Sequence, residues 1–129
     1  MFPSRRKLLA EKARLGRWGE RRAERFLKNQ GLRTLTRNFS CKTGELDLIM
    51  VDPEGAIVFI EVKTRADEAF SPAEAAITSR KKHRMVRAAR YFLSTHDLQD
   101  RSYRFDVVVV ILGPAGPPEM RHYPSAFVP

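Results

Sequence analysis

One stretch decides the fold: GELDLIMVDPEGAIVFIEVK, which runs from Gly44 to Lys63. Two apolar runs flank Pro53–Gly55, and this pattern predicts a β-hairpin. Each run carries an acid among apolar residues, Asp47 in the first and Glu61 in the second. An ionised carboxylate inside an apolar strand is costly unless a cation or hydrogen bonds compensate it. These two acids are therefore the first candidates for a functional site.

The register of the hairpin can be counted from its turn. A three-residue loop, Pro53–Gly55, makes Asp47 face Glu61. Directly opposite residues of an antiparallel pair share a face, with Cβ atoms about 5 Å apart. A loop one residue shorter or longer would place the two acids on opposite faces of the sheet. Lys63 follows Glu61 by two positions and shares its face, because strand side chains alternate. The count predicts two carboxylates and one amine converging on one spot.

This arrangement suits a hard divalent cation. Asp47 and Glu61 offer oxygen ligands to Mg²⁺ or Mn²⁺, and the Val62 carbonyl and waters complete the shell. Lys63 would orient or deprotonate the metal-bound water, or neutralise charge on a pentacovalent phosphate. The residues are those needed for phosphodiester hydrolysis. The alternative is a buried ion-pair network in an inactive protein that still binds nucleic acid.

Other chemistries lack their residues. The single cysteine, Cys41, excludes a disulfide framework and a thiolate metal cluster. The histidines, His83, His96 and His122, do not have the spacing of zinc ligands. The sequence contains neither a Gly-x-Ser-x-Gly motif nor a glycine-rich phosphate loop.

The chain is strongly basic. Its 129 residues include 24 Lys and Arg against 15 Asp and Glu, a formal net charge of +9. That excess favours a polyanionic partner, nucleic acid first and an anionic membrane surface second, over a basic surface that only confers solubility. The length suits a single domain over residues 1–129, with 1–7 flexible. Without a signal-peptide core or an apolar run of transmembrane length, we expect a cytoplasmic protein that does not bind membranes.

The remaining pattern alternates helices with strands. Apolar spacing predicts a helix over about 8–30, stopped by Gly31, and a strand over 32–39 before the hairpin. Ser71–Glu74 predicts a capped helix start, and this second helix runs to about residue 95 with an interruption and a second cap near Thr78. A continuous apolar strand follows over 103–112, as for a strand buried on both faces, and then a short edge strand over 120–123. The order α-β-β-β-α-β is that of an α/β fold with a mixed central sheet flanked by helices.

Three charged residues outside the hairpin have alternative roles. Glu20 lies at the edge of the apolar stripe of the first helix, and its position alone favours an ordinary boundary glutamate. Lys81 is directed toward the sheet, whereas Arg84 belongs to a basic helix face that is solvated by default. Asp106 begins a buried strand and fits a structural acid that pairs with Arg104 or Lys81 better than it fits a ligand.

Asp47 followed by Glu61-Val62-Lys63 resembles the PD-(D/E)xK signature of restriction-endonuclease-like nucleases, although no proline precedes the aspartate. The predicted order of elements resembles their common core. The match is closer to the YraN-type family, small bacterial proteins related to archaeal Holliday-junction resolvases. From Leu15 to Phe127 the chain resembles its motifs at GRWGE (16–20), RN (37–38), GELDLI (44–49), VFIEVKTR (58–65), Lys81, RFDVV (104–108) and SAF (125–127).

The resemblance implies a restriction-endonuclease-like fold and a Mg²⁺- or Mn²⁺-dependent endonuclease that acts on structured or branched DNA rather than RNA. It also implies that Glu20 joins Asp47 and Glu61 as a catalytic acid. No base-reading motif is visible, so we expect recognition through the phosphate backbone and its shape. The expected contacts are Arg17, Arg65, Lys81 and Arg84. A junction cutter needs two active sites, which is consistent with a homodimer. The rival interpretation is a non-catalytic nucleic-acid-binding module of the same fold.

Overall fold

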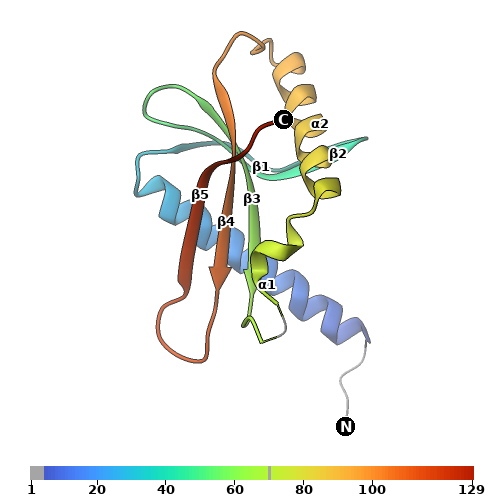
Figure 1. Cartoon of the computed structure of the whole chain (residues 1–129), viewed down its shortest axis with the longest axis vertical. Helices are drawn as coiled ribbons and strands as arrows, with labels where there is room; N and C mark the ends of the chain where they lie inside the picture. The colour runs from blue at the N-terminus through green and yellow to red at the C-terminus, as the bar shows by residue number, and fades with distance from the viewer. Residues whose placement is uncertain (1–4, 70) are drawn as a thin grey trace.

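The computed structural model describes residues 5–69 and 71–129, with side chains described from residue 10 onward, and shows a sheet with a helix on each side (Figure 1). The elements are α1 (Arg5–Lys28), β1 (Arg33–Cys41), β2 (Gly44–Val51), β3 (Ile57–Arg65), the 3₁₀ turn η1 (Ala73–Ala76), α2 (Ser79–Thr95), β4 (Tyr103–Ile111) and β5 (Glu119–Phe127). Of the segment expected to be flexible, residues 1–4 lie outside the described ranges, and α1 begins at Arg5. Neither helix has the length and apolarity needed to cross a membrane within these ranges.

The strands form one five-stranded sheet in the order β1-β2-β3-β4-β5. Only β3 and β4 run parallel, and the other neighbours are antiparallel, so the predicted mixed sheet and its order of elements are confirmed. The hairpin register is also confirmed, because Leu48 pairs with Ile60 and the Asp52 N–H donates to the Ala56 carbonyl at 2.9 Å.

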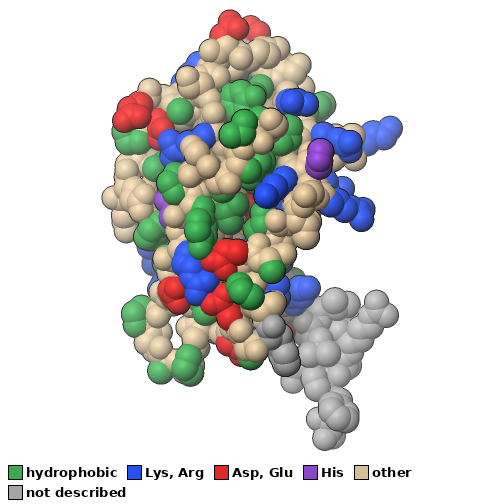
Figure 2. All heavy atoms as spheres, in the orientation of Figure 1, with side chains coloured by type: hydrophobic (Ala, Val, Ile, Leu, Met, Phe, Trp, Pro, Cys, Tyr) green, Lys and Arg blue, Asp and Glu red, His purple; other side chains and the backbone are tan. Residues whose placement is uncertain are grey.

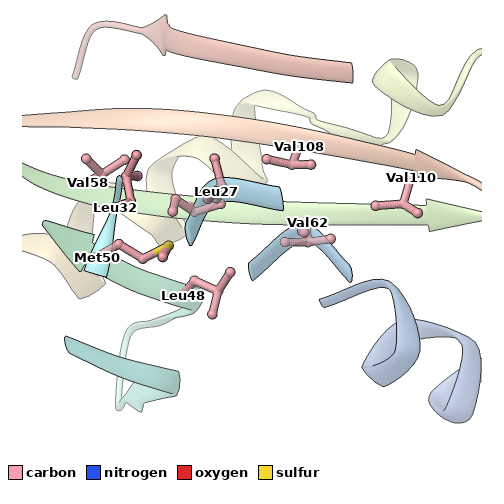
Figure 3. Packing of buried hydrophobic residues seen from close by; sticks show 10 residues of the cluster. Leu27, Leu32, Leu48, Met50, Val58, Val62, Val108 and Val110 are labelled. Carbon is pink, nitrogen blue, oxygen red and sulfur yellow. The ribbon is translucent and has the colours of Figure 1, made fainter. Parts of the chain in front are cut away.

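The two helices cover opposite faces of the sheet. On the α1 face, Leu27 packs against β2 and β3 residues such as Leu48 and Val62 (Figure 3). On the α2 face, Met85 and other α2 residues join a second cluster with strand residues such as Phe59. This two-sided burial explains why the central strands are apolar almost throughout, and why any acid within them stands out.

Both helices approach the sheet at a glycine. A Cβ on Gly19 of α1 would lie 1.8 Å from Thr64 Oγ1 of β3, and a Cβ on Gly44 of β2 would lie 2.0 Å from the Arg84 carbonyl oxygen of α2. Any larger residue would push the helix outward at these points. The two glycines therefore set how closely each helix, with its charged side chains, approaches the sheet.

The second helix begins later than the first predicted cap. Ser71–Glu74 leads only into η1, which has no side-chain cap, whereas Thr78 Oγ1 accepts the Lys81 N–H at 3.2 Å and caps α2. The capping-box prediction for Glu74 is wrong because its carboxylate is taken by Arg121 of β5 at 3.0 Å. The second cap near Thr78 is confirmed. The last strand, β5, is also longer than the short edge strand predicted over 120–123.

Candidate functional site

The strands β2 and β3 separate at the two acids of the hairpin. Their paired register ends at Leu48 and Ile60, although both strands continue beyond these residues. Past that point the Val62 N–H donates to Asp47 Oδ2 at 2.7 Å, so a side chain takes the place of the next ladder bond. A gap therefore opens between β2 and β3, with Asp47 on the β2 side and Glu61 on the β3 side.

The backbone of β2 is irregular at Asp47. Leu46 packs in the cluster under α2 and Leu48 in the cluster under α1, although residues two apart on a regular strand share a face. The pairing of β1 with β2 places Asn38 opposite Asp47, and Asn38 has a left-handed φ of 50°. Asp47 is half-buried at this point, close enough to Glu20 of α1 and Lys81 of α2 for their charges to interact.

Glu61 is 5% exposed and incompletely paired. Its Oε1 atom lies 3.2 Å from Lys81 Nζ, while Oε2 is buried with no hydrogen-bond partner among the described residues. Burial and then the negative charge of Asp47 raise the pKa of Glu61 to about 8, against the opposing effect of Lys81. Burial also raises the pKa of Asp47, although the Val62 N–H opposes that shift. The two carboxyl groups together favour binding either a proton or a further cation.

Glu20 meets Asp47 in a cleft of about 220 Å³ between α1 and the sheet. Arg17, Arg21 and Asn38 are among the other lining residues. Burial and then the charge of Asp47 raise the pKa of Glu20 to about 7, and Arg17 opposes them. The close approach of α1 at Gly19 places Glu20 here. Helix position alone predicted an ordinary boundary glutamate, but the structure brings Glu20 next to Asp47.

Lys63 is half-buried on β3, two residues beyond Glu61. Burial and then the charge of Arg65 lower the pKa of Lys63, and Glu61 opposes the shift. Within the described ranges, no carboxylate lies within ion-pair distance of its ammonium. Lys63 is therefore an amine available to a ligand beside the carboxylate pair.

The four residues expected to contact nucleic acid are placed differently. Arg17 is exposed at the cleft, and Arg65 is half-buried at the end of β3. Other Lys and Arg side chains project from the edge of the molecule near α2 (Figure 2), but Arg84 of α2 is half-buried, with Nη2 4.0 Å from Glu45 Oε1. Lys81 instead points inward, with Nζ 3.4 Å from Glu45 Oε1 as well as 3.2 Å from Glu61. Sequence reasoning missed Glu45 as a member of the site.

The residues present fit a divalent cation held by few protein ligands. The part of the chain that the structure describes contains no group of three or more His, Cys, Asp or Glu side chains placed to bind a metal ion. Two oxygens would come from the Asp47 carboxylate and from Glu61 Oε2, which accepts no hydrogen bond from the described residues. Because the Val62 N–H faces the gap, its carbonyl does too, since both groups of one strand residue point the same way. Such a site suits Mg²⁺, which keeps several waters and uses one or two carboxylates.

Asp106 lies outside this site. It is fully buried and accepts hydrogen bonds from Arg104 Nε at 3.0 Å, His122 Nε2 at 2.8 Å and the Ser125 N–H at 3.0 Å. The structural role inferred from the sequence, with Arg104 as the partner, is confirmed.

Comparison with known proteins assigns the chain to a family. Residues 19–110 match the model of the uncharacterised protein family UPF0102. The chain is 39% identical to a UPF0102 protein of Trichlorobacter lovleyi over 88% of its own length and 89% of the relative's. It is 42% identical to one of Pelobacter propionicus, over 87% and 81%, and 45% identical to one of Frankia alni, over 88% and 93%. The chain belongs to the UPF0102 family of bacterial proteins.

Proposed function

We propose that this UPF0102 protein is a metal-dependent endonuclease that hydrolyses phosphodiester bonds of structured or branched DNA. The observation that carries the proposal is the Asp47–Glu61 pair at the point where β2 and β3 separate, with one buried carboxylate oxygen lacking a donor. The resemblance of the same residues to nuclease motifs supports it.

Each residue of the site has a role in this proposal. Asp47 and Glu61 would hold Mg²⁺ or Mn²⁺ together with the Val62 carbonyl, and such an ion would supply activation of water and neutralisation of phosphate charge. Lys63 would orient the attacking water or accept its proton, which its lowered pKa favours. Glu20, with a pKa of about 7, can exchange a proton near neutral pH.

The substrate contacts follow from charge and position. Arg17 stands at the cleft that contains Glu20 and Asp47, and Arg65 and Arg84 add positive charge from β3 and α2. We propose that these side chains hold DNA through its phosphates, which would give shape recognition without base reading and binding that weakens steeply with salt. A junction substrate would engage two copies of the chain.

The test is cleavage of labelled duplex, flap and four-way-junction DNA in Mg²⁺ or Mn²⁺. We expect the wild type to cut a branched substrate. The cleavage rate of Glu61→Gln should be lower by at least about a hundredfold, which is the usual effect of removing a group that stabilises charge in the transition state. The matched control is Glu54→Gln, on the exposed turn of the same hairpin, which should cut normally. Cutting that is equal in Glu61→Gln and the wild type would exclude this site as the catalytic centre.

One observation favours a second candidate, a nucleic-acid-binding module without catalysis. Glu61 already has a cationic partner in Lys81, as a structural ion pair would. This alternative predicts DNA or RNA binding with no cleavage in either metal and no effect of metal on stability. Binding by Glu61→Gln should then equal binding by the wild type, because the basic residues are unchanged.

A further inference from the structure

Lys81 is placed inside the candidate site by the first turn of α2. Its own N–H is held by the Thr78 cap at 3.2 Å, and its side chain is only 26% exposed. The adjacent Lys82 turns elsewhere, with Nζ 5.6 Å from the centre of the Phe127 ring. Two neighbouring lysines of one helix thus have different surroundings, and only Lys81 reaches the carboxylates.

The ammonium of Lys81 lies between two acids. Nζ is 3.2 Å from Glu61 Oε1 and 3.4 Å from Glu45 Oε1. Two carboxylates at these distances favour the charged form of the lysine, so Lys81 is a cation between them. Its charge already offsets part of the repulsion between Asp47 and Glu61. A divalent ion bound to Glu61 would be repelled by an ammonium at this distance.

We propose that Lys81 is the resident counter-ion of the site, which a divalent cation displaces from Glu61 and which then pairs with Glu45. The inference rests on the proposed function, because it concerns the same metal site. It assigns Lys81 to the control of metal affinity rather than to a permanent phosphate contact.

Glu45 is suited to receive the displaced lysine. It lies on β2, two residues before Asp47, and its side chain is 52% exposed, against 7% for Glu61. Lys81 is already within ion-pair distance of both, so the helix need not move. Once released from the buried acid, the ammonium is closer to solvent and becomes available to a phosphate oxygen of a bound nucleic acid.

The first test measures Mn²⁺ binding by calorimetry in the absence of nucleic acid. Lys81→Met removes the competing charge and should bind Mn²⁺ about tenfold more tightly than the wild type, which is about 1.4 kcal/mol. Lys82→Met is the matched control, since it loses the same charge from the same helix turn but lies on the Phe127 side. It should bind Mn²⁺ as the wild type does. Equal affinity in the wild type and both variants would overturn the inference while leaving a metal-dependent nuclease intact.

A double-mutant cycle tests the step to Glu45. Glu45→Gln removes the alternative partner, so Lys81 should stay on Glu61 and Mn²⁺ affinity should fall. In the Lys81→Met background the same substitution should have little effect, because no lysine is left to displace. An equal loss in both backgrounds would show that Glu45 acts on the ion directly, and would overturn the exchange.

Folding outcomes are also decisive. If Lys81→Met and Lys81→Gln fold only when Mn²⁺ is added, the ion replaces the lysine, as the inference requires. If neither folds with or without Mn²⁺, Lys81 is a structural ion-pair partner and the inference is wrong. If the wild type and every variant fold but none binds Mn²⁺, both the inference and the proposed metal-dependent function fall.

Discussion

Two pairs of acids lie in this sheet, and their surroundings are opposite. Asp52 and Asp106 share Arg104, whose Nη1 lies 2.6 Å from Asp52 Oδ2 and whose Nε lies 3.0 Å from Asp106 Oδ1. Asp52 also accepts the N–H groups of Glu54 and Ala56, each at 2.9 Å. Burial raises the pKa of both acids, but these donors outweigh it, so both pKa values are lowered.

The Asp47–Glu61 pair has fewer donors, although Glu61 is as buried as Asp52. One backbone N–H and one ammonium serve two carboxyl groups, and the pKa values of both acids are raised. The comparison teaches that burial alone does not mark a functional acid. The first pair stabilises the fold because its carboxylates accept several hydrogen bonds, whereas the second pair has raised pKa values and a buried carboxylate oxygen without a donor among the described residues, which is typical of residues kept for binding or catalysis.

The largest expected effect comes from breaking the compensated pair. Arg104→Met leaves two buried carboxylates without their shared partner, so the free energy of unfolding should fall by about 3–5 kcal/mol. Urea denaturation at neutral pH measures this loss. Glu61→Gln in the metal-free protein is the contrasting variant, and it should be as stable as the wild type or more so. If the two losses were equal, the distinction between the pairs would be wrong.

A divalent ion should act on the second pair alone. At a hundredfold excess over its dissociation constant, Mn²⁺ should raise the stability of the wild type by about 2.7 kcal/mol. Glu61→Gln removes a ligand and should abolish the rise, while Glu54→Gln, outside the site, should keep it. Denaturation midpoints with and without Mn²⁺ give the comparison. A rise that survives in Glu61→Gln would place the ion elsewhere.

Local rules of the sequence predicted the frame of this site. Loop length predicted the hairpin register that pairs Leu48 with Ile60, and Asp47 and Glu61 are the next positions outward from this pair. Gly31, with a φ of +95°, ends α1 as predicted, close to the expected boundary. Both inferences depend on residues near each other in the chain, where turn geometry and capping leave few alternatives.

Contacts between distant residues account for what was missed. The predicted capping box at Glu74 is absent because Arg121, which is distant in sequence, donates a hydrogen bond to the Glu74 carboxylate. The separation of β2 from β3 depends on Asp47 bonding to Val62 across the hairpin, which register counting does not reveal. Glu45 was overlooked because its role comes from Lys81 of α2, although its position two residues before Asp47 was a usable signal.

Over a single pH unit, the smallest expected effect is a difference in pH dependence between the two pairs. Folded Glu61 keeps its proton to about pH 8, whereas the unfolded chain releases it near 4.5, so between these values the folded state binds more protons. Stability is therefore fully present below pH 4.5 for this group and is lost as the pH rises toward 8, by up to about 1.4 kcal/mol per pH unit. Asp106 acts in the opposite direction, because its lowered pKa stabilises the fold above about pH 3.8 and that stability is lost as the pH falls.

Urea denaturation of the metal-free wild type and of Glu61→Gln between pH 5 and 8 isolates the effect of Glu61. The stability of the variant should change less with pH than that of the wild type. Parallel profiles would mean that Glu61 titrates normally in the folded protein, and the two acid pairs would then differ in their contacts but not in their electrostatics.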